Sequence, residues 1–380
     1  MITSRKIRKV AIVHDWLPLF GGAERVLEQI LDLFPEASLY TLIDALPKAD
    51  RKFLFGRDVH TSFIQRLPFG KTHYRNFFPL MPLAIEQFNL SAFDLVVSSS
   101  YSFAKGVVTG PGQLHVCYCH SPIRYAWDLQ NQYLDEGGLR KGVKSLLVRL
   151  ALHYLRVWDV RTSAGVDHFL ANSHYVARRI EKVYRRKAHV IYPPIECDDF
   201  RVGRVKEDFY LTASRLVPYK KIPLVVDAFR GMPNRRLVVI GDGPQRSKID
   251  TRGISNVEFL GWQPTDVLRD HMERARAFIF PAEEDFGIMP VEAQACGTPV
   301  IAYNRGGVTE TVIDGETGTF FAEQSAQCIQ NAVQDFEMCE PAFSADRIRR
   351  NAERFNAVRF RSELSRFIDD AMENFSEKKF

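Results

Sequence analysis

Short, almost uninterrupted apolar runs dominate the chain, and they come in two series separated by helical patterns. The first series occupies residues 9–14, 37–42, 93–99, 114–120, 168–173 and 189–194, and the second occupies 209–214, 236–241, 257–261, 277–282 and 299–303. Runs rich in Val, Ile, Leu and Phe are typical of strands covered on both faces, as in parallel sheets. Helical patterns lie at 23–34, 174–184, 223–230, 265–274, 290–296 and 325–336. The alternation predicts two doubly wound α/β domains.

The length of the chain agrees with two domains. It has 380 residues, and a domain usually takes about 100–200. The segment 192–208 starts with prolines, continues with charged residues and separates the two series of strands. We therefore expect domains at 1–195 and 196–355. Residues 356–380 begin with an amphipathic helical pattern that Asn356 can cap, and this helix is expected to pack back toward the N-terminal domain.

The composition of the chain limits the kinds of ligand or partner that it can bind. Lys and Arg outnumber Asp and Glu by 51 to 46, which gives a net charge of +5. This mild excess suits anionic ligands such as nucleotides, or an anionic membrane surface. It is too weak and too dispersed for a nucleic-acid-binding protein, and no zinc-finger, helix-turn-helix or RRM pattern occurs. Six scattered cysteines without a CxxC spacing predict buried, reduced thiols in a reducing compartment.

The N-terminal segment has a basic start, as a signal peptide does. Its apolar run covers only residues 10–13 before His14 and Asp15 interrupt it, which is too short for the apolar core of a signal peptide. No run of 18 or more apolar residues occurs elsewhere, so no transmembrane helix is expected. The sequence predicts a cytoplasmic protein.

The stretch "FPAEEDFGIMPVEAQACGTPVIAY" holds two carboxylates around a glycine turn. Glu284 is expected at the carboxyl end of a strand, where open α/β sheets bind ligands, and Glu292 about one turn into the next helix. The backbone N–H groups of Phe286, Gly287 and Ile288 then form an anion site at the helix start. Two carboxylates flanking an anion site suit a nucleotide sugar, with one carboxylate for each sugar ring. The alternative is a solvated Glu284 and a Glu292 that only complements the helix dipole.

A second constellation is basic. "TASRLVPYKKIPLVVDAF" places Arg215 just after a strand, and Lys220 and Lys221 just before a helix. A guanidinium fork and an ammonium group both suit a diphosphate. A solvated basic loop is the alternative for this stretch in isolation.

Together the two elements resemble the retaining GT-B glycosyltransferases of family 4, also called glycosyltransferase group 1. The family's E-x-F-G-x-x-x-x-E-A element, with the A-x-G-x-P-V-I that follows it, stands as Glu284, Phe286, Gly287, Glu292, Ala293, Ala295, Gly297, Pro299, Val300 and Ile301. Its G/S-R-L-V-x-x-K element stands as Ser214, Arg215, Leu216, Val217 and Lys220. "GDGP", "FLGW" and "GGVTETVIDGETG" occur in the family's order. The resemblance covers nearly the whole chain and implies two Rossmann-like domains that face each other across a cleft. The N-terminal domain would bind the acceptor and the second domain the nucleotide sugar.

The resemblance also implies roles for individual residues. The donor-binding candidates are Gly21, Gly22, Arg215, Lys220, Lys221, Gly243, Phe286, Gly287, Ile288 and Glu292, and the catalytic candidates are His120, Glu284, Arg215 and Lys220. His120 would lie beside the donor sugar, although a histidine at a strand end can also be purely structural. Gly21 and Gly22 would face the diphosphate and the acceptor, although they can also serve an ordinary tight turn. "PIRYAWD" supplies the acceptor-side candidates Arg124, Tyr125, Trp127 and Asp128, and it resembles bacterial mannosyltransferases of O-antigen and exopolysaccharide assembly.

The implied reaction moves a hexose from a nucleoside diphosphate to an acceptor hydroxyl with retention of configuration. Arg215, Lys220 and helix amides would stabilise the charge that grows on the leaving diphosphate, Glu284 would position the hexose and Glu292 the ribose. No Asp-x-Asp stands at a strand end, so no essential metal and no cofactor are expected. The best guess is mannose from GDP-mannose, transferred to a lipid-linked saccharide in bacterial surface polysaccharide synthesis. A UDP- or dTDP-sugar donor, an epimerase or phosphorylase on the same fold, and a non-catalytic nucleotide-sugar-binding protein are the alternatives.

Two segments of the first domain, 71–88 and 139–161, mix cations with large apolar residues. The second places Val143, Leu146, Leu147, Leu150 and Tyr154 at helical spacing among Lys and Arg. This pattern suits a helix that lies on anionic lipid. It equally suits a core-facing helix whose cations reach out to water along their apolar stems. A lipid-linked acceptor would make peripheral contact with the inner face of the cytoplasmic membrane useful.

Overall fold

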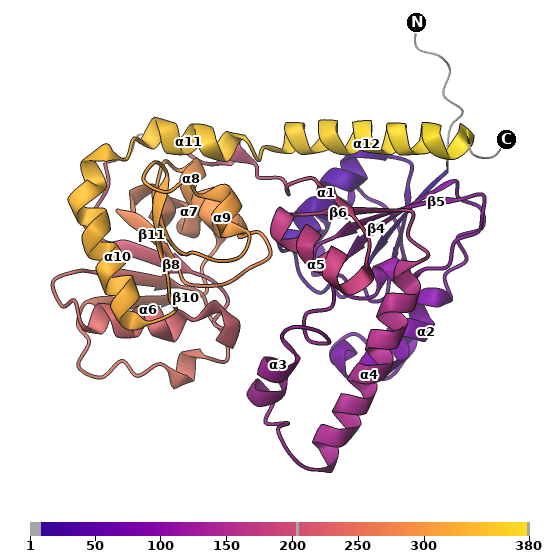
Figure 1. Ribbon diagram of the computed structural model, residues 1–380, viewed down its shortest axis with the longest axis horizontal. Coiled ribbons are helices and arrows are strands. Elements are labelled where there is room, and N and C mark those ends of the chain that lie inside the picture. The colour runs from indigo at the N-terminus through magenta and orange to yellow at the C-terminus, as the bar shows by residue number, and fades with distance from the viewer. Residues whose placement is uncertain (1–8, 203–204, 378–380) are drawn as a thin grey trace, which may run out of the picture. The chain divides into compact units, whose positions relative to one another are not determined.

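The computed structural model describes residues 9–202 and 205–377. The basic start at 1–8, two residues of the expected domain boundary and the last three residues lie outside these ranges. The chain divides into two compact units, and Figure 1 shows them with many of their helices and strands labelled. The first unit contains residues 1–192 and 360–380, and the second contains 193–359.

The first unit is built on a seven-stranded parallel sheet. Its strands are β1 (Val10–His14), β2 (Ser38–Thr41), β3 (Val59–Thr61), β4 (Leu95–Ser100), β5 (Leu114–Cys119), β6 (His168–Ala171) and β7 (Ala188–Val190). Their order is β3-β2-β1-β4-β5-β6-β7, and every pairing is parallel. The order therefore reverses between β1 and β4. All strands of the first predicted series are present, and β3 is an addition, since its three residues form no apolar run.

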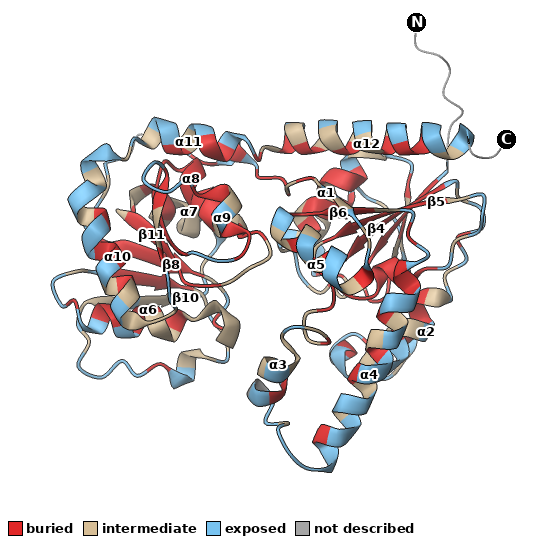
Figure 2. Ribbon diagram, in the orientation of Figure 1, coloured by how far each residue is buried: buried red, intermediate tan, exposed pale blue. Residues whose placement is uncertain are grey.

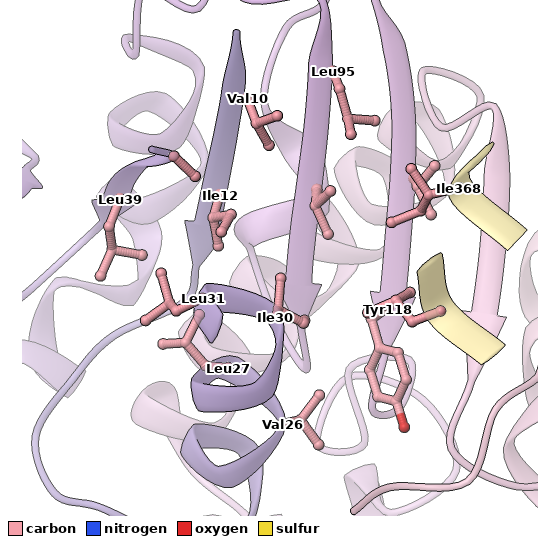
Figure 3. Packing of buried hydrophobic residues seen from close by; sticks show 14 of the residues in the cluster. Val10, Ile12, Val26, Leu27, Ile30, Leu31, Leu39, Leu95, Tyr118 and Ile368 are labelled. Carbon is pink, nitrogen blue, oxygen red and sulfur yellow. The ribbon is translucent and has the colours of Figure 1, made fainter. Parts of the chain in front are cut away.

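Helices cover this sheet and extend from it. They are α1 (Gly22–Leu33), α2 (Met81–Glu86), α3 (Gln130–Glu136), α4 (Val143–Ser163), α5 (His174–Tyr184) and α12 (Ala357–Glu377), with short 3-10 helices at η1 (Lys48–Leu54), η2 (Phe63–Arg66), η3 (Tyr74–Leu80) and η4 (Ala104–Gly106). In Figure 3, α1 directs Val26, Leu27, Ile30 and Leu31 toward the strands. The spacing of these residues leaves them all on one face of the helix, and burial of each contributes about 1.5–3 kcal/mol.

The C-terminal helix α12 completes the same core from residue 360 onward. Leu364 and Ile368 are buried with the α1 side chains, and the rings of Phe360 and Tyr118 lie 5.8 Å apart. The predicted cap is confirmed, because Asn356 Oδ1 accepts a hydrogen bond from the backbone N–H of Arg359 at 2.8 Å. The core of the first unit is therefore completed by residues from the far end of the sequence.

The second unit holds a six-stranded parallel sheet. Its strands are β8 (Tyr210–Ala213), β9 (Leu237–Ile240), β10 (Val257–Gly261), β11 (Ala277–Phe280), β12 (Val300–Tyr303) and β13 (Gly318–Phe321), in the order β10-β9-β8-β11-β12-β13. Its helices are α6 (Ile222–Arg230), α7 (Thr265–Arg274), α8 (Ile288–Ala295), α9 (Val308–Thr311), α10 (Ala326–Cys339) and α11 (Ala345–Glu353), with 3-10 turns at η5 (Cys197–Asp199), η6 (Pro218–Lys220), η7 (Arg246–Lys248) and η8 (Glu340–Ala342). The prediction of two doubly wound α/β sheets is confirmed, and β13 is a further addition.

The cysteine prediction holds for most of the thiols. All six are free, and Cys117, Cys119, Cys197 and Cys296 are buried. Cys328 is half-buried, and Cys339 is exposed at the end of α10. The expectation of burial is therefore wrong for Cys339, the last residue of α10.

Helix α4 settles one of the open alternatives. The five apolar residues Val143, Leu146, Leu147, Leu150 and Tyr154 are between 53% and 76% exposed, and the corresponding part of α4 is coloured as exposed in Figure 2. The buried residues of the same helix include Leu152, Leu155 and Asp159, and they lie on its opposite side. The core-facing interpretation is wrong for this set. In the segment 71–88, by contrast, Met81, Ala84 and Ile85 are buried in a core cluster.

Candidate active site

In the second unit, the two sequence elements meet at the point where the strand order reverses. The reversal lies between β8 and β11, and ligands of open parallel sheets bind outside the carboxyl ends of such strands. Arg215 follows β8 by two residues, and Glu284 follows β11 by four. The fold thus brings together two stretches that are far apart in the sequence.

Lys220 and Glu284 make direct contact at this edge. The ammonium Nζ of Lys220 forms an ion pair with Oε1 of Glu284, and the two side chains are 15% and 19% exposed. Lys220 ends the turn η6, and its ammonium lies 5.5 Å from the centre of the Tyr219 ring. Lys221 takes a left-handed conformation (φ +56°) and caps α6. The basic loop is therefore not simply solvated, because one of its cations is partly buried against a carboxylate.

Arg215 lies on a loop that is held by close backbone contacts. A Cβ on Gly241 (φ +129°) would lie 1.8 Å from the carbonyl oxygen of Ser214, and a Cβ on Gly243 (φ +155°) would lie 2.6 Å from that of Leu216. The N–H of Leu216 also donates to the carbonyl of Asp242 at 2.9 Å. The backbone of the "GDGP" element therefore packs directly against the backbone of the loop that carries Arg215. The Arg215 side chain is exposed, so its guanidinium can reach a ligand.

The turn that carries Glu284 is supported in the same way. Gly307 donates its N–H to the carbonyl of Glu284 at 2.8 Å. A Cβ on Gly306 (φ +85°) would lie 2.5 Å from that carbonyl oxygen, and a Cβ on Gly307 would lie 2.4 Å from the oxygen of Asp285. The two glycines of the "GGVTE" element are therefore required by the backbone of the carboxylate turn, whatever else they do.

The helix start beside this turn has the predicted form. Gly287 (φ +86°) is the N-cap of α8, and Ile288 is its first residue. Gly287 has no side chain that could cap this end, and the N–H groups at a helix start suit an anion. The Phe286 side chain is buried edge-on against Phe355 at 5.6 Å, which leaves only its backbone for a ligand. Glu292 is 3% exposed, and a buried carboxylate needs bonding partners. The interpretation as a mere surface complement to the helix dipole does not fit this burial.

The first unit has its own polar cluster at the reversal between β1 and β4. His14 ends β1, and its Nδ1 lies 3.0 Å from Oγ of Ser99 on β4. The same oxygen lies 2.9 Å from Nε2 of His120. On the other side, Nε2 of His14 lies 3.3 Å from Oε1 of Glu24, whose second oxygen accepts the N–H of Gly21 at 3.0 Å. A continuous chain of hydrogen-bonding groups thus joins the glycine loop to His120, and Gly22 begins α1 within it.

Sequence reasoning identified His120 and the glycine loop but missed His14, Glu24 and Ser99. His14 could have been recognised from its position in the sequence, because it ends a strand just as His120 follows one. Burial, with a contribution from the neighbouring His14, lowers the pKa of His120 to about 3. The ring is therefore neutral at physiological pH and acts as a hydrogen-bonding group. Asn172 supports the segment by donating to the carbonyl of His120 at 3.0 Å.

The four acceptor-side candidates separate into two pairs. Trp127 and Asp128 line a cavity of about 500 Å³ in the first unit, whereas Arg124 and Tyr125 are absent from its lining. The hydroxyl of Tyr125 lies 3.0 Å from Oγ of Ser102, and its ring packs against a core cluster. Burial raises the pKa of Tyr125. Tyr125 thus has a structural role that the sequence did not indicate.

Within residues 9–202 and 205–377, no three imidazole, thiol or carboxylate groups gather closely enough to hold a metal ion. The metal-independent mechanism stays a prediction.

Comparison with known proteins gives matches in both halves of the chain. Residues 20–199 match the family described as Glycosyltransferase Family 4, and residues 197–355 match the family described as Glycosyl transferases group 1. A GDP-mannose-dependent alpha-(1-6)-phosphatidylinositol monomannoside mannosyltransferase of Mycolicibacterium smegmatis is 35% identical over 152 residues, which are 36% of this chain and 40% of that protein. An uncharacterized glycosyltransferase of Methanocaldococcus jannaschii is 29% identical over 157 residues, 40% of this chain and 44% of that protein. The matches thus span less than half the length of these curated relatives.

Solved structures are similar over nearly the whole chain. The Anabaena protein HepE in complex with UDP has a TM-score of 0.70 at 19% identity, with 95% of this chain and 100% of that chain covered. Sucrose-phosphate synthase of Thermosynechococcus elongatus has a TM-score of 0.72 at 15% identity, with 97% and 100% covered. At such identities the likeness shows the fold, which is GT-B. Because the two family matches together run from residue 20 to residue 355, and because two parallel α/β sheets carry them, the chain belongs to the family 4, or group 1, glycosyltransferases.

Proposed function

We propose that the chain transfers a hexose from a nucleoside diphosphate sugar to a saccharide acceptor and retains the anomeric configuration. The observation that carries this proposal is the contact between Lys220 and Glu284. In a nucleotide sugar, the hexose is bonded directly to the second phosphate. A cation for that phosphate and a carboxylate for the hexose hydroxyls must therefore be neighbours, as these two side chains are.

The remaining groups at this edge suit the rest of the donor. The exposed guanidinium of Arg215 offers a planar fork of donors for diphosphate oxygens, and the start of α8 adds backbone N–H groups. Glu292, one turn into α8, is assigned the ribose hydroxyls. Each charge-assisted hydrogen bond is worth about 1.5–3 kcal/mol, so three or four of them account for a substantial part of the affinity for a nucleotide.

In the proposed reaction, the acceptor oxygen forms a bond to the anomeric carbon while the bond from that carbon to the phosphate oxygen breaks. The electron pair of the broken bond stays on the diphosphate, and the acceptor proton passes to the phosphate oxygen on the same face. Arg215 and Lys220 stabilise the growing negative charge, and because Lys220 is already held against Glu284, its position needs little reorganisation in the transition state. The role of His120 beside the donor sugar stays a prediction.

For the donor, GDP-mannose is our preferred candidate, and bacterial surface polysaccharide is the preferred product. The GDP-mannose-dependent relative from Mycolicibacterium supports this choice, together with the "PIRYAWD" stretch. HepE was crystallised with UDP and with UDP-glucose, which supports a UDP-sugar as the alternative.

Calorimetric titration of GDP, UDP, dTDP and their sugars into the full chain tests the proposal. We expect one nucleotide to bind, and the matching sugar nucleotide to be consumed when an acceptor is supplied.

Glu292→Ala should weaken nucleotide affinity, whereas Glu284→Ala should mainly lower turnover. The reverse pattern would exchange the two assigned roles. Binding without turnover for every acceptor would favour the non-catalytic alternative.

We further propose that the exposed apolar face of α4 lies on an anionic membrane. Residues 137–158 contain no Asp or Glu, and the exposed Lys141, Lys144 and Arg149 lie beside the apolar residues. Exposed apolar side chains next to uncompensated cations suit an anionic lipid surface. No helix in the described part of the chain is long and apolar enough to cross a bilayer, so the proposed contact is peripheral. A lipid-linked acceptor would be presented at that surface.

Sedimentation with phosphatidylglycerol vesicles at low salt tests this contact. The wild-type chain should pellet with the vesicles, and Leu147→Glu should leave most of it in the supernatant, because a charge then replaces an apolar contact. Val108→Glu is the matched control, since Val108 is 61% exposed and Leu147 is 59% exposed in the same unit. Equal binding of the two variants would contradict the assignment of α4.

A further inference from the structure

The first unit contains a cavity that the proposed donor chemistry does not use. Its volume is about 500 Å³, within the range of about 300–1,000 Å³ that small-molecule sites usually have. It lies between α5, the second half of α4 and the segment that leads into α3. The lining residues are Ala126, Trp127, Asp128, Gln130, Arg156, Tyr175, Arg178, Arg179, Lys182 and Val183.

Cationic residues outnumber carboxylates among the residues that line the cavity. Four lining side chains, Arg156, Arg178, Arg179 and Lys182, are cationic, and Asp128 is the one carboxylate among them, so the balance is 4 − 1 = +3. Arg179 forms an ion pair with Asp128 and donates to Oγ of Ser121 at 2.9 Å. One cation is thereby neutralised, and three positive charges remain at the wall of a single cavity.

Those three cations form no ion pair with any residue in the described part of the chain. Arg156 donates to the carbonyl of Ala126 at 3.0 Å and to the side-chain oxygen of Gln130, both of which are neutral. Arg178 and Lys182 are exposed and stand one turn apart on α5. No described carboxylate lies within ion-pair distance of either. Like charges at this spacing repel each other, and a bound anion would remove that repulsion.

Aromatic rings complete the wall. The indole N–H of Trp127 donates to Oδ2 of Asp159 at 2.8 Å, and Asp159 is fully buried. This bond fixes the orientation of the ring at the cavity. Tyr175 lines the cavity from α5, next to the cations. Aromatic rings beside cations, one of them held in place by Asp159, suit a ligand that has both a ring and a negative group.

We infer that this cavity binds a phosphate or diphosphate group carried by the acceptor, with the attached sugar against Trp127. The inference rests on the proposed function, since it assigns the second substrate of the same reaction. The cavity is tied to the polar cluster of the unit, because Ser121, the hydrogen-bond partner of Arg179, directly follows His120. The phosphate can belong to a lipid-linked diphosphate sugar or to a soluble sugar phosphate, which present the same group to the cavity.

The test measures binding of inorganic pyrophosphate to the full chain by calorimetry. Because the proposed donor site also suits pyrophosphate, the titration uses the Arg215→Ala/Lys220→Ala variant as its background. We expect this background to bind pyrophosphate, and the added changes Arg178→Glu and Lys182→Glu to weaken binding roughly 10-fold or more, about 1.4 kcal/mol. Arg178→Ala/Lys182→Ala serves as a second variant if the charge reversal impairs folding.

The matched control is Lys48→Glu/Lys52→Glu. These two exposed lysines of η1 have the same spacing and lie outside the cavity lining, so the change in net charge is identical. The control should leave pyrophosphate affinity within about twofold. Equal loss in both reversals would show a general field effect and would overturn the inference, as would the absence of pyrophosphate binding to the background chain.

A parallel nucleotide titration separates this inference from the proposed function. With Arg215 and Lys220 intact, Arg178→Glu/Lys182→Glu should leave nucleotide affinity unchanged. If no nucleotide binds the wild-type chain, the proposed function fails whatever the pyrophosphate result is. Glucose 1-phosphate in solution and farnesyl diphosphate in phosphatidylcholine vesicles then distinguish the sources. The probe that binds the wild-type chain more tightly identifies the kind of acceptor that carries the phosphate. If each probe binds the wild-type chain and Arg178→Glu/Lys182→Glu equally well, the proposed site is refuted.

Discussion

Replacing Lys220 by alanine is expected to lower kcat for glycosyl transfer by about 10²–10³-fold, the usual effect of removing one fixed group that stabilises transition-state charge. The ammonium of Lys220 is partly buried against Glu284, so its position does not depend on the ligand. Charge on the leaving diphosphate is largest in the transition state, and the loss should therefore fall mainly on kcat. The measurement is steady-state turnover of the donor identified by titration.

Two further variants make this result specific. Lys248→Ala removes an exposed lysine of η7 in the same unit and should leave kcat unchanged. Lys220→Arg keeps the charge but changes its shape, and it should recover part of the activity. A Lys220→Ala enzyme with wild-type kcat would remove the main support for the proposed donor site.

The second large effect concerns stability. Asp159→Asn is expected to lower the free energy of unfolding of the first unit by about 3–5 kcal/mol, because it leaves a buried ammonium without its counter-ion. Lys105 and Asp159 form an ion pair in which both side chains are almost fully buried. Asp159 also accepts hydrogen bonds from Trp127 at 2.8 Å and from the hydroxyl of Tyr184 at 3.0 Å. One carboxylate thus holds three groups from different parts of the unit.

Tryptophan fluorescence during urea unfolding can follow this change. Three of the four tryptophans, Trp16, Trp127 and Trp158, lie in the first unit, and the fourth, Trp262, is 74% exposed. The control is Asp135→Asn, which breaks the solvent-exposed pair with Arg140 and should leave the unfolding midpoint unchanged. Adding Lys105→Met to Asp159→Asn should restore part of the stability, since no buried charge then remains. Equal stability of Asp159→Asn and wild type would contradict this account.

Most of the fold follows from local pattern. The long apolar runs became strands, and helices such as α5 and α7 begin and end at the predicted residues, because the runs are continuous and the helix starts are well marked. Strands β3 and β13 escaped prediction for a physical reason. Each is an edge strand of three or four residues, and pairing with an existing neighbour, rather than its own hydrophobicity, makes it a strand.

Only those residues of the candidate site that belong to a recognisable sequence motif could be predicted. The Lys220 and Glu284 elements could be identified because their spacing is distinctive. The series of hydrogen-bonding groups from Glu24 through His14 and Ser99 to His120 forms only because three strands and a helix meet at one edge of the sheet. No local sequence pattern predicts that meeting. Burial of α4 was ambiguous for a related reason. A helix with apolar residues on two sides has two possible core faces, and only tertiary packing selects one.

The glycine contacts around Arg215 and Glu284 have a consequence for how such an enzyme can change. Both turns are held by close backbone contacts. Gly241 and Gly243 contact the Arg215 loop, and Gly306 and Gly307 contact the Glu284 turn. Their shape is therefore largely independent of the side chains that they display. Selection, or a designer, can exchange those side chains to admit a different sugar while the loops keep their course. New donor preferences would then be accessible in single mutational steps, whereas the glycines themselves should tolerate almost no variation.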